Sequence, residues 1–161
     1  MVDKNQAIID YMLTCPAIAN NSVYFNAIQA KDNNKELMTL ASDKNTHTPY
    51  IDGSVSKRYT FTLIDFKSIS YNPLVGVIGT SVVNNENVQD MLDVQGIMDW
   101  ITEQNELRNF PNFGTDCVID EIKTVTENPN LNGIQDNLTP ALAKYSFSVQ
   151  VDYIDNSKCI Y

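Results

Sequence analysis

The sequence predicts an α+β fold in which a mostly antiparallel β-sheet packs with an N-terminal helix and one long amphipathic helix. Three observations predict this fold. Residues 52–68 and residues 141–154 both alternate apolar and polar side chains, which is the period of a β-strand. Residues 88–107 instead repeat apolar side chains with the period of a helix. The predicted elements follow one another as helix, strands, long helix and strands without a linker, so we expect a single domain over residues 1–161.

The first predicted element is a helix that begins at Lys4. Asp3 is placed to cap this helix, and Gln6, three residues on, completes a pattern that resembles a capping box. Pro16 follows shortly and ends the helix, because proline cannot continue the hydrogen-bond ladder. The apolar stripe of the helix consists of Ile8, Ile9, Met12 and Leu13.

Two shorter strands are predicted before the first alternating strand. Residues 22–30 are rich in apolar and aromatic side chains, and residues 36–42 are a weaker strand candidate. A polar turn at residues 32–34 separates these two strands. Residues 43–53 are predicted to be a polar loop that ends in the turn signal Asp52-Gly53.

The first alternating strand carries few polar side-chain atoms on either face. We expect one face to be packed against the core, and this face consists of Tyr59, Phe61 and Leu63. The other face consists of Thr60, Thr62, Ile64 and Phe66. Either a helix or an adjacent copy of the protein is expected to cover this second face, and the sequence alone leaves that choice open.

The long helix is predicted to be amphipathic. Its apolar stripe consists of Met91, Val94, Ile97, Met98 and Ile101. Its acidic side carries Asp99, Glu103 and Glu106. The segment before the helix, residues 70–87, is apolar and carries glycine, and it is expected to form either a loop that packs on a neighbour or a short extra strand.

After the long helix, residues 117–126 are predicted to form a strand and residues 127–140 a polar hairpin loop. The final alternating strand has two distinct faces. One face carries Tyr145, Phe147, Val149, Val151 and Tyr153. The opposite face carries Lys144, Ser146, Ser148, Gln150 and Asp152, so we expect that face to be wet or lightly covered.

The sequence predicts no catalytic residues, no bound cofactor and no metal site. His47 is the single histidine and lies in a polar segment without a marked nucleophile nearby. The three cysteines occur singly and lack the close pairs that structural zinc uses. The net charge of −9 argues against nucleic-acid binding through phosphate neutralisation. We therefore expect a protein that is not an enzyme and does not bind nucleic acid specifically.

The sequence also lacks the signals of a membrane or secreted protein. No segment approaches the run of roughly twenty apolar residues that crosses a bilayer. Asp3 and Asp10 flank a very short apolar run near the N-terminus, which fails as a signal peptide. The odd cysteine count favours free thiols in a reducing compartment. We expect a soluble protein that is made in the cytoplasm.

The order of several segments resembles a family of small proteins from tailed phages and prophages, labelled minor capsid or tail terminator proteins. These proteins are encoded in the head-to-tail connection region. The resemblance covers about half of the chain, and none of its motifs is a chemical signature. The segments that carry the resemblance are IDYMLTCP (9–16), DGS with KRYTF (52–61), DWITEQN with FP (99–111) and YSFSVQV (145–151). Residues 70–87 and the loop at residues 127–140 are longer than the family pattern.

The resemblance implies a structural virion protein at the neck, the head–tail junction. A tail terminator forms a ring, usually of six copies, at the head-proximal end of the tail tube. The implied partners are further copies of the chain, the tail tube protein, the head–tail connector or stopper proteins and, in a contractile tail, the sheath protein. DNA would pass through the lumen of such a ring. The alternatives are a head-completion protein that binds the connector, or a small cytosolic enzyme or adaptor of unknown ligand.

Two groups of residues are candidates for contacts in such an assembly. The first is a possible subunit or partner interface, with packing on the same subunit as the alternative: Leu74, Val75, Val77 and Ile78. The second is a possible acidic lumen face, with a solvated outer helix face as the alternative: Asp99, Glu103 and Glu106.

Overall fold

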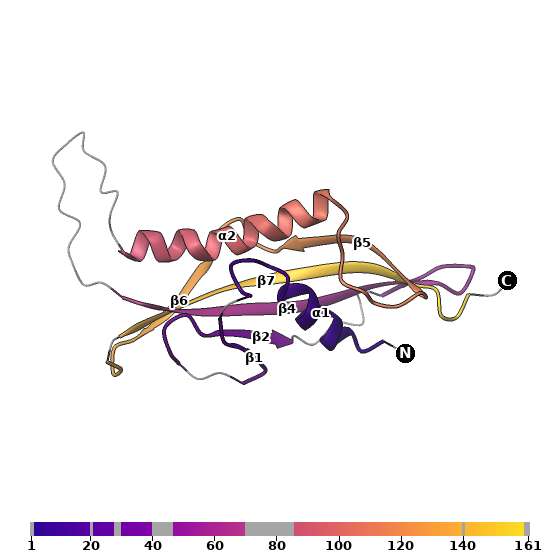
Figure 1. Ribbon diagram of the computed structural model, residues 1–161. Coiled ribbons are helices and arrows are strands. Elements are labelled where there is room, and N and C mark those ends of the chain that lie inside the picture. Colours follow the sequence, from indigo (N-terminus) through magenta and orange to yellow (C-terminus); the bar gives the residue numbers. More distant parts are fainter. Residues whose placement is uncertain are drawn as a thin grey trace.

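A computed structural model of the chain describes residues 2–19, 21–27, 30–39, 47–69, 86–139 and 141–159 (Figure 1). Within these residues, two helices accompany one seven-stranded sheet. The helices are α1 (Lys4–Met12) and α2 (Glu86–Glu106). The strands are β1 (Val23–Phe25), β2 (Lys35–Thr39), β3 (Thr48–Pro49), β4 (Val55–Ser68), β5 (Cys117–Thr124), β6 (Asn130–Gln135) and β7 (Leu142–Asp155).

The sheet is organised around its two longest strands, β4 and β7. They pair antiparallel over their full length, from Val55 opposite Asp155 to Ser68 opposite Leu142. The strand order is β1-β2-β4-β7-β5, with β3 added beside β4 and β6 beside β7. Only the β1–β2 pair is parallel among the described strand pairs. The α+β fold with a mostly antiparallel sheet is therefore confirmed.

Both described helices pack on the same face of the sheet. Opposite residues of antiparallel strands point to the same face, so Leu63 and its partner Phe147 both point toward the helices. Figure 1 shows α2 running along the sheet and α1 lying across β4. The helices contribute these buried residues to the shared core: Ala7, Ile8, Tyr11, Met12, Val94, Ile97, Met98 and Ile101. Burying these side chains is the main favourable term in holding the layers together.

The second face of the sheet is not covered by either helix. At one end, Ile64, Phe66 and Leu142 form a small buried cluster. Ala30 and Leu138 from connecting segments, together with Met38 of β2, pack against this cluster. Toward the other end, Thr60 and Gln150 stand opposite each other and are only half-buried. Of the two predicted covers for this face, the helix is excluded among the described residues.

The start of α1 follows the prediction in part. Asp3 caps the helix, and its Oδ1 accepts a hydrogen bond of 2.9 Å from the backbone N–H of Asn5. The predicted capping box is wrong, because the Gln6 side chain donates to Asp10 Oδ1 at 2.8 Å instead of reaching back to the cap. The predicted stripe is only partly right: Leu13 is 41% exposed and Tyr11 is buried in its place.

Three further predictions about the elements need correction. β1 is three residues long where nine were predicted, because Asn26 has a φ of 52° and turns the chain out of the sheet. The loops predicted at residues 43–53 and 127–140 contain β3 and β6. Met91 was predicted in the buried stripe of α2 but is 40% exposed. The segment 70–85 lies outside the described residues, so the prediction of a loop or extra strand there stays a prediction.

No described helix is long and apolar enough to span a lipid bilayer.

Candidate functional site

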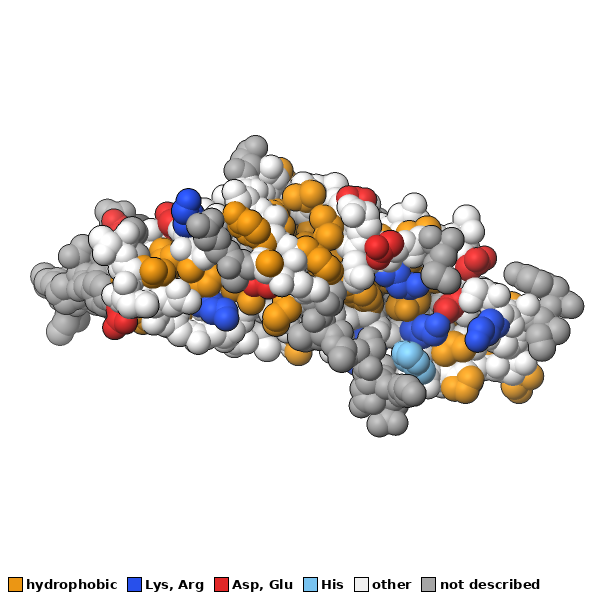
Figure 2. All heavy atoms as spheres, turned by 90° about the horizontal axis from the view of Figure 1, so that it is seen from below, with side chains coloured by type: hydrophobic (Ala, Val, Ile, Leu, Met, Phe, Trp, Pro, Cys, Tyr) orange, Lys and Arg blue, Asp and Glu red, His pale blue; other side chains and the backbone are white. Residues whose placement is uncertain are grey.

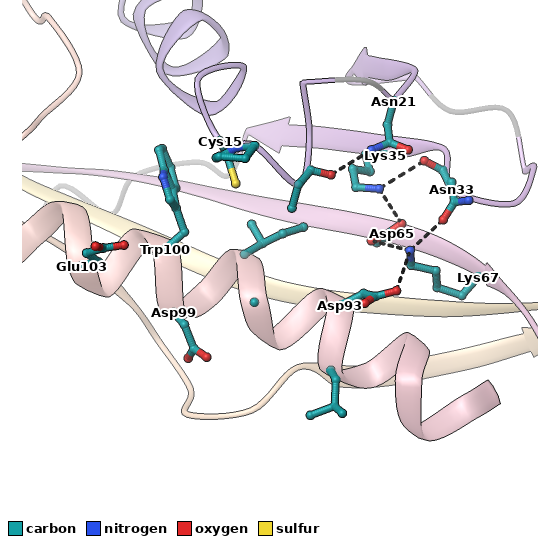
Figure 3. Close-up of a pocket in the computed structure, with 15 residues that line it drawn as sticks. Cys15, Asn21, Asn33, Lys35, Asp65, Lys67, Asp93, Asp99, Trp100 and Glu103 are labelled. Carbon is teal, nitrogen blue, oxygen red and sulfur yellow. Dashed lines mark hydrogen bonds and ion pairs between the residues drawn. The ribbon is translucent and has the colours of Figure 1, made fainter. Parts of the chain in front are cut away.

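A cavity of about 650 Å³ lies between α2, the chain that follows α1, and strands β2 and β4 (Figure 3). This volume falls in the range of roughly 300–1,000 Å³ found for ligand sites. The cavity joins an apolar wall to a charged floor. Its lining residues are Cys15, Pro16, Ala17, Asn21, Asn33, Lys35, Asp65, Lys67, Leu92, Asp93, Gly96, Ile97, Asp99, Trp100 and Glu103.

The charged floor of the cavity is built by strand alternation. Asp65 and Lys67 are two and four positions beyond Leu63 in β4, so they point to the same helix-covered face. Lys35 of β2 stands directly opposite Asp65 in the antiparallel ladder. The Lys35 Nζ lies 3.3 Å from Asp65 Oδ1, and the two side chains are 2% and 1% exposed. A lysine and an aspartate are thus ion-paired in the interior, next to the apolar core.

Asn33 lies in the turn before β2 and accepts hydrogen bonds from both lysines of the floor. Its φ of 63° is a left-handed conformation that asparagine tolerates better than most residues. The Nζ of Lys67 donates a 2.7 Å hydrogen bond to Asn33 Oδ1, and the Nζ of Lys35 donates to the Asn33 carbonyl oxygen at 3.3 Å. Figure 3 shows these contacts meeting around Asp65. The turn predicted at residues 32–34 is confirmed, and it positions the floor of the cavity.

Burial dominates the electrostatics of this floor. It raises the pKa of Asp65 and lowers the pKa of Lys35, because water that would stabilise each charge is excluded. Lys35 holds the Asp65 carboxylate at ion-pair distance, and no other side chain among the described residues donates a hydrogen bond to it. Lys67 is the second cation near this carboxylate, with its Nζ 3.9 Å from Asp65 Oδ2 and 3.9 Å from Asp93 Oδ2.

The opposite wall of the cavity is one side of α2. Asp93, Gly96 and Trp100 follow one another at spacings of three and four residues, which places them on a common helix face. Trp100 points from α2 toward the chain that follows α1 (Figure 3), and its ring centroid lies 5.2 Å from that of Tyr11. A Cβ built on Gly96 meets no atom within 4 Å, so this glycine opens into free space.

The functional residues predicted from the sequence differ in whether they line this cavity. The predicted interface residues Leu74, Val75, Val77 and Ile78 lie outside the described residues. The predicted acidic face of α2 is exposed, in agreement with its assignment to the polar side of the helix. Asp99 and Glu103 line the cavity, whereas Glu106 does not. A lumen role for these three carboxylates stays a prediction.

Sequence reasoning missed the charged floor. A signal for two of its residues was present, because the alternation that assigns Tyr59, Phe61 and Leu63 to one face continues to Asp65 and Lys67. A charge that continues a core-facing series indicates a buried ion pair or a binding site. Lys35 carried no such signal, since its pairing with Asp65 depends on the register between two strands.

The chemistry of the cavity favours binding over covalent attack. Cys15 is the thiol that lines it, and burial raises the pKa of this thiol, which keeps it protonated and poorly nucleophilic. The Lys35 amine is 2% exposed and faces Asp65, so a substrate has no open approach to it. Among the described residues, no group of three or more metal-ligating side chains is arranged to hold a metal ion.

Comparison with known proteins gives no assignment, since no protein-family model and no curated protein matches the chain.

Proposed function

We propose that the chain is a structural subunit of a tailed-bacteriophage virion, a tail terminator that forms a ring at the head-proximal end of the tail tube. The ordered resemblance of the four segments described above supports this proposal. In this role the ring stops tube polymerisation and joins the tail to the head connector. Its partners are other copies of the chain, the tail tube protein and the connector or stopper proteins, together with the sheath protein in a contractile tail.

The observation that carries the proposal is the second face of the sheet. The β4–β7 pair is closed on one face by both described helices, while Thr60 and Gln150 on the other face remain half-buried. Next to them, Arg58 and Asp152 form a bidentate ion pair across the strands, at 2.7 Å and 3.1 Å. Interfaces between subunits commonly bury such mixed surfaces, because hydroxyl, amide and paired charged groups find partners across them. A neighbouring copy in a ring is a cover of this kind.

The surface composition also fits a ring subunit that surrounds DNA. Figure 2 shows hydrophobic side chains gathered in groups between scattered acidic and basic ones on the face seen from below. Such groups are suited to contacts with other protein surfaces. The net charge of −9 repels phosphate groups, which suits a lumen through which DNA must move without being bound tightly.

Electron microscopy of particles assembled without this protein tests the proposed role. We expect overlong or irregular tails that are not joined to heads. Normal tails together with heads that leak DNA would contradict tail termination and favour the head-completion role. Fully normal, infectious particles would contradict both roles.

A matched pair of variants tests the proposed interface. Thr60→Arg places a long cation on the second face, where a free subunit can let it reach water but a packed neighbour cannot. Thr102→Arg makes the same change at an exposed position of α2. Both variants are expected to keep a wild-type far-UV circular dichroism spectrum. Only Thr60→Arg should fail to restore tails of defined length, and normal restoration by Thr60→Arg would remove the second face from the proposal.

A further inference from the structure

β6 lies at an outer edge of the sheet and exposes its backbone there. Its one partner strand among the described residues is β7, from Asn130 opposite Ser146 to Gln135 opposite Leu142. No described backbone group outside β7 bonds to residues 130–135, and five of the six residues of β6 are exposed. Such an edge carries unpaired N–H and C=O groups, which match the backbone of one further strand.

Two other edges of the described sheet are poorly suited to an added strand. In β5, the backbone N–H of Ile122 donates a 2.9 Å hydrogen bond to Asn105 Oδ1 of α2, so this N–H is already engaged. A register shift between Ile119 and Glu121 also interrupts β5, and β1 is only three residues long. Short strands, bulges and charges are common protections of a sheet edge. β6 is longer than β1, and its sequence NLNGIQ contains no charged residue.

Leu131 and Ile134 give the β6 edge an apolar side. They stand opposite Tyr145 and Ala143, which belong to the core on the helix-covered face, so both point to that face. Residues three apart in a regular strand point to opposite faces, and the register shift between Leu131 and Gly133 brings these two to the same one. Leu131 is 54% exposed and Ile134 is 50% exposed, so the described helices leave them uncovered.

We propose that β6 pairs antiparallel with β6 of a second copy of the chain, which joins the two sheets across a two-fold axis. The placement of the two apolar residues favours a second copy as the partner. A register that sets Leu131 opposite Ile134 of the other copy also sets Ile134 opposite Leu131 of that copy, so one arrangement satisfies both contacts. The four side chains then form one apolar cluster, and the backbone groups of both edges are paired.

This inference does not depend on the ring assignment, because the proposed ring contact uses the second face of the sheet and this contact uses the β6 edge. Sedimentation velocity of the full chain tests it. Two strands of this length bury less than a standard interface, so we expect dimers to form as the concentration rises from about 1 to 500 µM. Amide hydrogen exchange of residues 130–135 should slow over the same range, because pairing engages the edge amides.

A matched pair of variants locates the contact. Leu131→Lys places a charge on the β6 edge, where lysine opposes strand pairing, and should weaken dimerisation on the order of tenfold or more. Leu107→Lys makes the same change at the end of α2, where the leucine is 67% exposed, and should dimerise like the wild type. Both variants should keep a wild-type circular dichroism spectrum. A capped peptide of sequence NLNGIQ, added in excess to the wild type, should compete with the second copy and lower the dimer fraction.

Several outcomes would overturn the proposal. Monomers over the whole concentration range contradict pairing with a second copy. Slow exchange of residues 130–135 that does not change with concentration shows that the edge is already paired within one copy. Dimers or hexamers that form equally well in Leu131→Lys and Leu107→Lys assign self-association to another surface, such as the second face. If Leu131→Lys unfolds, peptide competition and hydrogen exchange of the wild type decide the question.

Discussion

The buried Lys35–Asp65 pair should dominate the sensitivity of this fold to single substitutions. At a distance of 3.3 Å, the attraction between the two charges is about 5 kcal/mol for an effective dielectric constant of about 20. Replacing Asp65 by asparagine leaves Lys35 as an uncompensated buried charge. We expect this variant to lose about 3–5 kcal/mol of unfolding free energy. Deprotonation of Lys35, whose pKa burial already lowers, limits the loss.

The reverse substitution should cost less, because the pair is asymmetric. In Lys35→Met, Asp65 retains Lys67 at 3.9 Å, and the attraction over that distance is about 4 kcal/mol at the same dielectric constant. Burial also raises the pKa of Asp65, so this side chain can take up a proton. The double variant Lys35→Met with Asp65→Leu removes both buried charges. Its stability should return to within about 1 kcal/mol of the wild type or exceed it.

Urea unfolding followed by circular dichroism measures these differences as a double-mutant cycle. The exposed pair Glu121–Lys123, whose charged atoms are 2.9 Å apart, is the control. Its coupling energy should stay below about 1 kcal/mol because solvent screens it. A loss for Lys35→Met as large as that for Asp65→Asn would contradict the asymmetry of the pair. A double variant that loses the sum of the two single losses would contradict the coupling between the two charges.

Local geometry and charge also determine the stability contributions of Gly53, Asp155 and Asp90. Gly53→Ala should destabilise the fold by more than about 1 kcal/mol in thermal unfolding, because Gly53 has a φ of +89° and its Cβ would lie 2.3 Å from the Lys158 carbonyl oxygen. Unchanged stability would show that this turn relaxes freely. The 2.6 Å hydrogen bond from Lys57 depresses the pKa of Asp155, so the stability that this pair contributes is present above about pH 4 and is lost as the pH falls. Asp155→Asn should therefore flatten the acid limb of a stability profile, and an identical acid limb would contradict the assignment. Burial raises the pKa of Asp90 to about 6, which has the opposite sign: stability is lost as the pH rises from about 4, the pKa of an unfolded aspartate, to about 6, and the loss is complete above that. Asp90→Asn should raise stability at pH 7.5 more than at pH 5, as measured by urea unfolding, and an equal gain at both values would refute the shift.

The elements that the sequence predicts well are those with a strong local pattern. The alternation in residues 52–68 and 141–154 locates β4 and β7 to within a few residues, because a half-buried strand must alternate. The apolar period locates α2 for the same reason. β6 escaped prediction because only Leu131 and Ile134 of its residues, NLNGIQ, are large and apolar, and because it includes Gly133, where the register with β7 shifts. β6 forms because β7 presents a free edge, which is a property of the tertiary structure.

The candidate cavity contains residues that local sequence patterns do not bring together. Asp65 and Lys67 can be assigned to the core face by extending the alternation, which indicates an unusual buried charge. Lys35 and Asn33 come from another strand and its preceding turn, and only the β2–β4 register brings them together. From the sequence, the glycine in α2 is expected only to weaken the helix. In the structure it is the open part of a cavity wall, because the neighbouring layer leaves that space free.

The central strand pair also constrains when this protein can fold during synthesis. β4 and β7 come from distant parts of the chain; Lys57 and Asp155, for example, are 98 positions apart. Closing a loop of that size costs entropy before the strand contacts that offset this cost can form, so such topologies fold slowly. A nascent chain cannot complete its central strand pair until β7 has left the ribosome. Until then the edge of β4 that pairs with β7 is open to other chains, so rapid release of the C-terminal strand is a condition for avoiding aggregation.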